Sequence, residues 1–597
     1  QTCALPILDA STIPIGLYSW KVDSRFGNVT YIPVDTLQHA FQNSNDMGGY
    51  TGQYNYLGNL GSPRLSRIFF DRRDPSQYFF TDPYDFCVQR PEDVIFTNTL
   101  SPFTNLTYYK GGGSRDGEER FKSYFAINAN KRLGFGFYID YLYGRGLYQD
   151  QSTAFFNGGL FSSYRGDKYD MHFIFNNDNL KMAENGGITD DRYITNPLDM
   201  AEGKKEYSAN EIPTRLSQIW NHNTSYHAFL THRYNLGFYK EKQDSVDTDS
   251  VKITQVFVPV TSFIHTLQVD LNNRKYISYD DAQNQKYFEH NYLGTDSIDK
   301  TKRTSIKNTI GIALQEGFNK WAKAGLTAFL SYEYRNFALT DTTNIPGQRI
   351  INNYKESSLS IGGELSKKQG KLLHYNILGE LAIAGEDAGQ FSVEGRGDLN
   401  LRLFGDTVRL DVNAFIKNQN PVFYFRHFQS KHYWWDNNDL SKIMRTRLEG
   451  KLSLDRWGTQ LRAGVENIKN YTYLANTSIP VKDSEGNVTG FKNNAAVRQH
   501  SGNIQIFTAM LQQKLKVGIF HLDGEVAYQK SSEQDILPLP ELSAYGNLYM
   551  KFGLAKKVLQ IEMGADVRYF SKYYAPDYSP VIGQFYNQNP DDKIEIG

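Results

Sequence analysis

The feature that most constrains this chain is an alternation of apolar and polar residues that recurs along most of its length. In the stretch that begins at Val558, Leu559 and Ile561 fall on one face, whereas Glu562 and Arg568 fall on the other. Successive side chains of a β-strand project to opposite faces, so this period of two predicts an all-β fold. The same pattern recurs at 399–403, 408–416, 448–454 and 520–528.

The predicted strands are too long for an ordinary soluble sheet. We expect about 10 to 15 residues in each, against about 5 to 6 in a typical globular strand, and a strand needs about 9 to 11 to cross a bilayer. Aromatic residues make up 14% of the 597 residues, yet charges of both signs fill the polar faces. A membrane barrel exposes both kinds of side chain, whereas a soluble sandwich, the alternative, covers its apolar face with a second sheet.

Short and long connections alternate along the chain. Outer-membrane barrels have this asymmetry, with tight periplasmic turns and extended outer loops. We therefore predict a large antiparallel transmembrane β-barrel of about 18 to 20 strands over residues 104–597. Such barrels usually have an even strand number, and we expect one or more closing strands to be missing from this sequence. The long outer loops are predicted at 176–226, 272–301, 418–443 and 476–500.

The first hundred residues lack the long alternation. Residues 1–22 show neither a Met start nor a signal sequence, and we expect a non-native or disordered lead there. Residues 23–103 mix aromatics, charges and prolines, as in the run FFDRRDPSQYFFTDPYDF. This segment is expected to form either a plug in the lumen or a periplasmic collar at the barrel mouth, and the sequence leaves both open.

Four short motifs resemble a known family. They are LGNLGSP at 57–63, PFTNLTY at 102–108, ENGGI at 184–188 and HRYNLG at 232–237. Together they resemble the putative porin family of Bacteroidota outer membranes, and the similarity runs from about Trp20 to the end. The resemblance implies a β-barrel in the outer membrane of a Gram-negative cell, and it supplies no catalytic residues.

The sequence offers no catalytic chemistry. The 65 basic and 65 acidic side chains give a formal net charge of zero, so there is no electrostatic reason to expect a nucleic acid partner. No phosphate-binding loop, dinucleotide motif, HExxH or GxSxG is present. His427 and His432 share one aromatic loop without a third ligand, and we expect no metal there. We therefore predict no enzyme activity, no cofactor and no metal.

Inward charges are one group of candidate functional residues. If the apolar faces meet lipid, the charges on the opposite faces line the lumen, where rings of charge set the field that admits or rejects solutes. Their mixed sign predicts weak ion selectivity. Alternatively, they pair across neighbouring strands and stabilise the wall. The candidates are Arg447, Glu449, Lys451, Arg462, Glu466, Asp566 and Arg568.

Aromatic residues in one predicted loop are the second group. Their rings could stack on sugars or bind a partner protein. The reading that we favour is a folded outer loop that packs its own rings over the barrel rim. The residues are Phe423, Tyr424, Phe425, Tyr433, Trp434 and Trp435.

The preferred function is that of an outer-membrane porin, which allows passive diffusion of small hydrophilic solutes through a water-filled lumen. Its expected partners are outer-membrane lipid and those solutes. The alternative is a non-conducting barrel subunit of an outer-membrane assembly or secretion complex, whose partners would be other outer-membrane proteins.

Overall fold

The computed structural model describes most of the chain. The ranges described are 16–34, 41–113, 116–201, 207–247, 250–279, 281–342, 348–403, 406–556 and 558–597.

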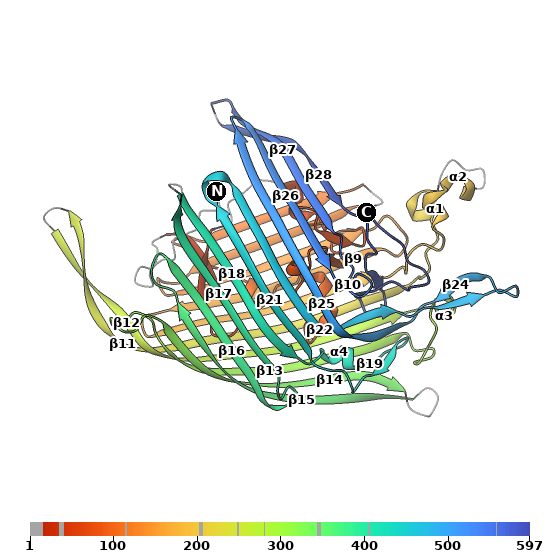
Figure 1. Cartoon of the computed structure of the whole chain (residues 1–597), viewed down its shortest axis with the longest axis horizontal. Helices are drawn as coiled ribbons and strands as arrows, with labels where there is room; N and C mark the ends of the chain where they lie inside the picture. Colours follow the sequence, from red (N-terminus) through yellow and green to blue (C-terminus); the bar gives the residue numbers. More distant parts are fainter. Residues whose placement is uncertain are drawn as a thin grey trace.

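Within these residues, nineteen antiparallel strands form a closed barrel, which confirms the predicted fold class and strand range (Figure 1). The expected even strand number and the expected missing closing strands are wrong, because this ring is odd in number and closes between β28 and β6. Each strand pairs with the next along the chain, and β28 lies beside β6 in the ring. The strands are β6 (Phe103–Gly111), β7 (Glu118–Asn128), β8 (Leu133–Arg145), β9 (Ser152–Arg165), β10 (Tyr169–Ala183), β11 (Ile219–Asp247), β12 (Ser250–Ser278), β13 (Ile298–Leu314), β14 (Gly325–Thr342), β15 (Arg349–Lys367), β16 (Leu373–Gly385), β17 (Phe391–Leu403), β18 (Asp406–Gln419), β21 (Ile443–Leu454), β22 (Thr459–Asn476), β25 (Ala495–Val517), β26 (Phe520–Ser531), β27 (Leu542–Leu554) and β28 (Leu559–Phe570).

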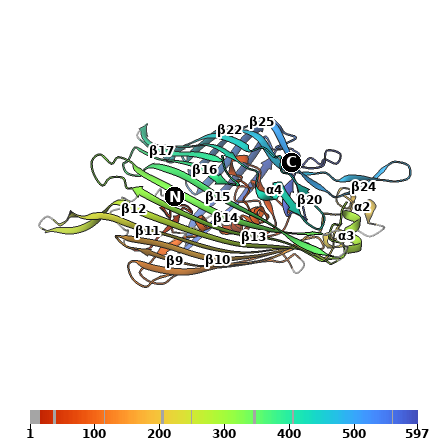
Figure 2. The same ribbon diagram turned by 90° about the horizontal axis from the view of Figure 1, so that it is seen from below.

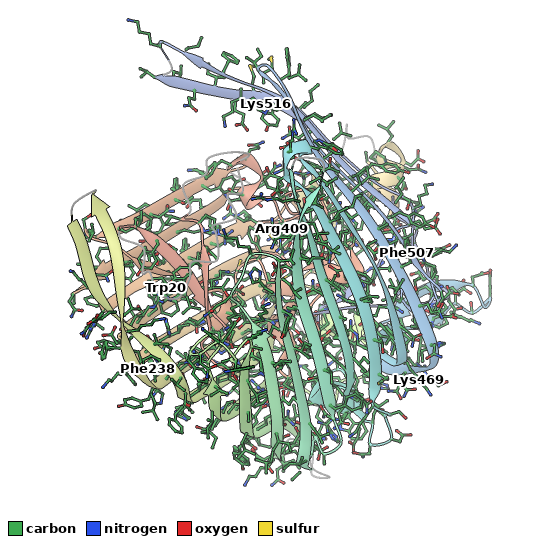
Figure 3. All side chains as sticks on the ribbon, turned by 60° about the vertical axis from the view of Figure 1, so that its left-hand side comes forward. Trp20, Phe238, Arg409, Lys469, Phe507 and Lys516 are labelled. Atoms are coloured by element: carbon green, nitrogen blue, oxygen red, sulfur yellow. The ribbon has the colours of Figure 1, made fainter. Side chains whose placement is uncertain are left out.

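The outward face of the barrel is apolar and uncovered. Ile312, Leu326 and Val465 are each more than half exposed, at 55%, 55% and 52%. Such a belt of apolar side chains is what hydrocarbon chains solvate in a transmembrane barrel. Figure 3 shows side chains on both sides of the sheet, with Phe238 on the long β11–β12 hairpin and Lys516 on the projecting β25–β26 hairpin. None of the helices in the described part of the chain combines the length and apolarity needed to cross a bilayer.

The two ends of the barrel differ, as the connection lengths predict. Tight turns lie at one end, together with the η6 turn (Asp455–Trp457). Long connections gather at the other end, to the right in Figure 2. We call these the turn end and the loop end. The loop end carries α1 (Arg192–Thr195), α2 (Pro197–Met200), η5 (Ala209–Glu211), α3 (Asp281–Tyr287), α4 (Phe423–Arg426), β19 (His427–Gln429), β20 (Trp434–Asp436), β23 (Ile479–Lys482) and β24 (Val488–Lys492).

Three of the predicted loops, 176–226, 272–301 and 476–500, are too long. The strands extend into them, and the observed connections are 184–218, 279–297 and 477–494. Residues such as Asn221 and Asn272 made these stretches look like loops, but both side chains are buried. They are polar because they face the barrel interior. The fourth connection, 420–442, agrees with the predicted loop at 418–443.

The N-terminal segment, residues 16–34 and 41–102, folds as short pieces. Its strands β2, β1 and β5 form a three-stranded sheet in that order. Residues 1–15 lie outside the described residues, but the lead predicted at 1–22 is too long because β1 begins at Tyr18 and buries Trp20. The elements are β1 (Tyr18–Val22), β2 (Val29–Ile32), η1 (Phe41–Asn45), β3 (Tyr54–Tyr56), β4 (Arg64–Ser66), η2 (Phe69–Asp71), η3 (Phe79–Tyr84), η4 (Pro91–Asp93) and β5 (Phe96–Asn98).

This segment lies inside the barrel. Trp20 packs against inward residues of β9 and β10, among them Phe161 and Ile174. Its indole Nε1 donates a hydrogen bond to His172 Nε2 at 3.1 Å. Figures 1 and 2 show the red and orange N-terminal pieces enclosed by the strands.

The last residues also leave the wall of the barrel. The predicted barrel range of 104–597 is therefore too long, because the strands of the wall end with β28 at Phe570. Beyond it, β29 (Asp577–Ser579) and β30 (Gln584–Tyr586) form a small hairpin. The Gln584 Nε2 amide donates a hydrogen bond to the Phe79 carbonyl oxygen at 2.7 Å, which ties this hairpin to the N-terminal segment.

Candidate functional site

The interior of the barrel has two unlike walls. On the first wall, β7–β14, inward polar side chains such as Asn157, Thr266 and Ser331 are at most 4% exposed. On the second wall, β17–β28, some inward charges remain open: the side chains of Lys451 and Asp411 are 39% and 27% exposed, whereas that of Glu466 is fully buried. The N-terminal segment therefore fills the lumen unevenly and leaves polar space along the second wall.

The predicted lumen charges of β21 and β22 form cross-strand ion pairs. Arg447 Nε lies 2.6 Å from Glu466 Oε2, and Arg462 Nε lies 2.8 Å from Glu449 Oε1. Arg447 and Glu466 are register partners, which places their side chains on the same face. Such pairs across neighbouring strands stabilise a sheet.

Lys451 shows how the register places these charges. It lies opposite Asp411 on one side and opposite Arg462 on the other. Its ammonium pairs with Asp411 at 3.3 Å. Two cations thus lie side by side, and each is neutralised by a different carboxylate.

The N-terminal segment supplies two further carboxylates to this wall, and we call Asp71 and Asp74 the carboxylate latch. Asp71 Oδ1 lies 2.6 Å from Arg462 Nη1. Asp74 accepts a hydrogen bond from Arg445, and its Oδ2 lies 3.4 Å from Lys417 Nζ. Burial raises the pKa of Asp74, but Arg445 and Lys417 outweigh it and hold that pKa below its usual value.

The remaining predicted charges lie on the last strand. Arg568 pairs with Asp566 at 3.2 Å and also with Asp46 of the N-terminal segment. The neighbouring residue Asn45 accepts a hydrogen bond from Arg120 of β7 at 3.5 Å. The N-terminal segment therefore bridges β28 and β7 from inside, across the place where the ring of strands closes.

A cavity of about 260 Å³ opens between the paired charges in the turn-end half of the second wall. Three of the predicted lumen charges line it, and no aromatic residue does. Polar and charged groups without rings suit water and small hydrophilic solutes better than a stacked sugar. The lining residues are Asp411, Asn413, Glu449, Lys451, Gln460, Arg462, Met510 and Gln512.

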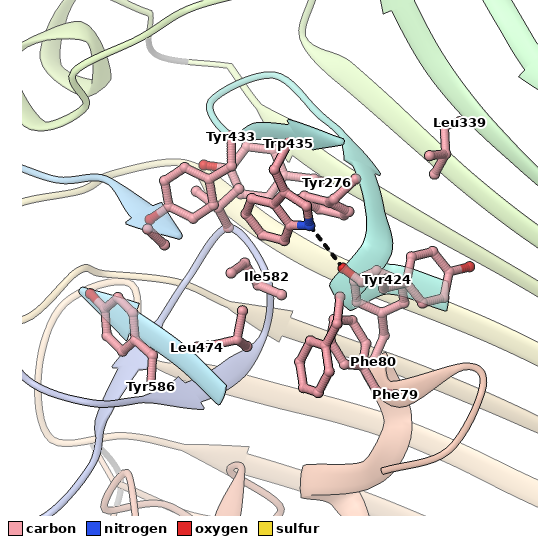
Figure 4. Close-up of a cluster of buried hydrophobic side chains, with 14 of the residues drawn as sticks. Phe79, Phe80, Tyr276, Leu339, Tyr424, Tyr433, Trp435, Leu474, Ile582 and Tyr586 are labelled. Atoms are coloured by element: carbon pink, nitrogen blue, oxygen red, sulfur yellow. Dashed lines mark hydrogen bonds between the residues drawn. The ribbon is translucent and has the colours of Figure 1, made fainter. Parts of the chain in front are cut away.

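The predicted aromatic loop folds into the loop end of the lumen. Trp434 is 48% exposed, whereas the other five rings are at most 7% exposed, so they offer no free face to a ligand in this conformation. They belong to a buried group that we call the mouth cluster, shown in Figure 4. It contains Tyr78, Phe79, Phe80, Leu216, Ile219, Tyr276, Phe288, Phe337, Leu339, Phe423, Tyr424, Phe425, Phe428, Tyr433, Trp435, Leu474, Ala495, Val581, Ile582 and Tyr586.

Three segments that are distant in sequence meet in the mouth cluster. Tyr424 stacks on Phe79 with ring centroids 5.3 Å apart and meets Phe80 edge-on at 4.6 Å. The Trp435 indole Nε1 donates to the Tyr424 carbonyl oxygen at 3.0 Å (Figure 4). Ile582 comes from the C-terminal segment. The loop thus packs on rings of other segments as well as its own.

Polar groups beside the mouth cluster are also buried. Arg274, 1% exposed, donates to Asn221 Oδ1 at 2.5 Å and also to the Val581 carbonyl oxygen. Glu184 accepts hydrogen bonds from Asn221 at 2.6 Å and from the Tyr578 hydroxyl at 2.9 Å. Burial raises the pKa of Glu184 to about 8 despite these bonds. The loop end of the lumen is therefore closed by packed rings and buried polar groups.

Sequence reasoning missed several residues of this site. Asp71, Asp74, Phe79 and Phe80 lie in a run that stood out by composition, but nothing in the sequence identified their partners. The two histidines of the loop have structural partners, one within the loop and one in the β12–β13 connection. His427 Nδ1 lies 2.6 Å from Asp436 Oδ1, and His432 Nδ1 donates to the His290 carbonyl oxygen at 2.8 Å.

A family model described as "Putative porin" matches residues 16–597. The chain belongs to this family. No curated protein matches it. Its fold is similar to those of solved transporters and receptors. The copper transporter OprC is 9% identical with a TM-score of 0.54, over 88% of this chain and 82% of that one.

Two receptors give similar values. The siderophore receptor PirA from Acinetobacter baumannii is 9% identical with a TM-score of 0.50, over 80% of this chain and 74% of that one. A variant of the ferric enterobactin receptor PfeA from Pseudomonas aeruginosa is 11% identical with a TM-score of 0.50, over 84% of this chain and 73% of that one. At these identities the likeness shows the fold alone. Family and fold together identify a β-barrel of the putative porin family.

Proposed function

We propose that this barrel passes small hydrophilic solutes by passive diffusion along its second wall. The observation that carries the proposal is the solvent-accessible cavity between the paired charges of that wall. Asp411 and Glu449 line it together with their partners Lys451 and Arg462, so the two signs balance. A path lined in this way favours hydrated solutes over apolar ones and selects weakly between anions and cations.

The mouth cluster closes this path at the loop end in the conformation described. Removing buried aromatic rings from it leaves a void where water can enter. We therefore expect small conductance from the wild type in planar bilayers and a several-fold increase from the double variant Phe79→Ala/Tyr424→Ala. Trp434→Ala is the matched control, because it removes an exposed ring from the same loop. Its conductance should equal that of the wild type.

Ion selectivity gives a second readout of the same path. With a salt gradient across the bilayer, the reversal potential of the open double variant should stay near zero, because the lining charges balance. A strongly selective current would contradict the proposed route along the second wall.

The alternative is a non-conducting barrel in an outer-membrane assembly, and the sealed mouth cluster favours it. Silence of both the wild type and the double variant, with the barrel folded, would support this alternative. Extraction in mild detergent should then recover other outer-membrane proteins with the chain. A diffusion porin should instead be recovered alone or with copies of itself.

A further inference from the structure

The turn end of the barrel carries an unusually basic pocket. It lies where the β13–β14 turn, the β15–β16 turn and the β11–β12 hairpin meet, and its volume is about 490 Å³. Four lysines line it, against the single carboxylate of Glu316. The lysines are Lys240, Lys320, Lys323 and Lys367.

The one carboxylate is already used by the backbone. Glu316 Oε2 accepts hydrogen bonds from the N–H groups of Lys368 at 2.6 Å and Gln369 at 3.2 Å. Within the described residues, none of the four lining lysines forms an ion pair of its own. The pocket therefore holds a local excess of positive charge that this part of the chain leaves unneutralised.

The turn beside the pocket is ordered around an exposed tryptophan. The Asn319 side-chain oxygen accepts hydrogen bonds from the N–H groups of Trp321 at 2.8 Å and Ala322 at 2.9 Å. These bonds hold the turn while the Trp321 side chain remains 90% exposed. Tryptophan is enriched where a membrane protein meets lipid headgroups, because its ring is apolar and its N–H is polar.

The pocket lies at the edge of the lipid-facing belt. β13 ends at Leu314 and β14 begins beside Leu326, both exposed and apolar, and Lys367 follows the exposed Leu365 by two residues on β15. Side chains two residues apart on a strand share a face, so Lys367 points outward, on the turn-end side of the apolar belt. In a bilayer that covers this belt, Lys367 would lie near the headgroups of the leaflet at the turn end.

We propose that this pocket binds the phosphate of an anionic phospholipid in the leaflet at the turn end, with Trp321 in the headgroup layer beside it. Lysine ammonium groups bind phosphate through charge-assisted hydrogen bonds. Basic clusters at a membrane surface attract anionic headgroups, with each lysine adding to the affinity. A neutral, zwitterionic headgroup gains little from the same charges.

Native mass spectrometry of the full chain with dioleoyl phosphatidylglycerol or dioleoyl phosphatidylcholine tests the proposal. We expect selective retention of phosphatidylglycerol by the wild type. The variant Lys320→Gln/Lys323→Gln/Lys367→Gln should bind it roughly tenfold to 100-fold more weakly. The control Lys131→Gln/Lys168→Gln/Lys556→Gln removes three exposed lysines from other tight turns and should bind as the wild type does.

A fluorescence measurement reports lipid bound next to Trp321, whereas mass spectrometry reports all lipid bound to the protein. Brominated phosphatidylglycerol in vesicles should quench Trp321 more than brominated phosphatidylcholine does, and Trp321→Phe should remove this difference. Equal binding of both lipids, or equal loss in the control variant, would overturn the proposal. So would saturation by inorganic phosphate that abolishes the preference for phosphatidylglycerol, because the pocket would then be a site for free phosphate.

Discussion

The two walls of this barrel present the same kind of face to lipid and different faces to the interior. Phe329 on the first wall is buried against Phe26 of the N-terminal segment, with ring centroids 5.3 Å apart. Lys451 on the second wall pairs with Asp411 beside an accessible cavity. The difference arises from what covers each wall and not from the strands themselves. One barrel can therefore combine a covered interior wall with an open one.

The largest expected effect is a loss of stability on breaking a buried ion pair of the first wall, compared with breaking an open ion pair of the second. Arg335 on the first wall is 3% exposed and lies 3.1 Å from Glu356 and 2.8 Å from Asp387. Arg335→Met leaves Asp387 without its ion-pair partner and Glu356 with Arg426 alone, and it should lower the free energy of unfolding by about 3 to 5 kcal/mol. Lys451→Met breaks an open pair and should cost less than about 1 kcal/mol.

Urea-induced unfolding in lipid vesicles, followed by the gel mobility of the folded barrel, would measure both variants. Equal losses would mean that the second wall is as tightly covered as the first. The comparison between the walls would then fail.

A pH effect should come next, from Glu184 at the loop end of β10. Its folded pKa of about 8 lies above its ordinary value of 4.5, so folding binds a proton between these two values. Its contribution to stability is complete below pH 4.5 and is lost as pH rises to about 8. The slope is at most about 1.4 kcal/mol per pH unit.

Glu184→Gln tests this assignment, because the amide cannot ionise. Unfolding measured from pH 5 to pH 9 should show a weaker pH dependence in the variant than in the wild type. Parallel profiles for the two proteins would show that Glu184 is already ionised in the folded barrel.

The smallest effect should come from the carboxylate latch on the second wall. Asp71→Asn/Asp74→Asn removes partly exposed pairs and should loosen the N-terminal segment by about 1 kcal/mol per pair. Salt screens such pairs, so openings of the wild type in planar bilayers should become more frequent at high salt, and those of the variant should not. Asp167→Asn, which breaks an exposed pair with Arg132 at a tight turn, is the control.

If the variant opens no more often than the wild type at low salt, the carboxylate latch does not hold the N-terminal segment in place. The mouth cluster would then be the sole closure that the described contacts support.

The sequence predicted the outward face well, because lipid imposes one requirement on every strand. The alternation at Leu559–Phe570 and the tight turns fixed the fold class, and the strand count fell within the predicted range. The inward face was less predictable. Asn157 and Asn413 are both polar residues on the inward face of a strand. Asn157 is nevertheless 1% exposed, whereas Asn413 lines the cavity.

The mouth cluster shows the same limit. The aromatic loop could be recognised in the sequence by its composition. Its partners Phe79 and Phe80 could not, because they lie more than 300 residues away in the chain. The charges of β21 and β22 could be assigned to the interior from their alternation. Their carboxylate partners Asp71 and Asp74 could not, because no periodic pattern connects an irregular segment with a strand.

Thiol labelling tests the difference between the walls most directly. With both native cysteines replaced, single cysteines at Asp411 and Lys451 on the second wall should react with a membrane-impermeant maleimide at least about tenfold faster than cysteines at Asn157 and Ser331 on the first. The buried positions react only when the segment opens locally. Equal rates at all four positions would contradict the unevenly filled lumen on which this account depends.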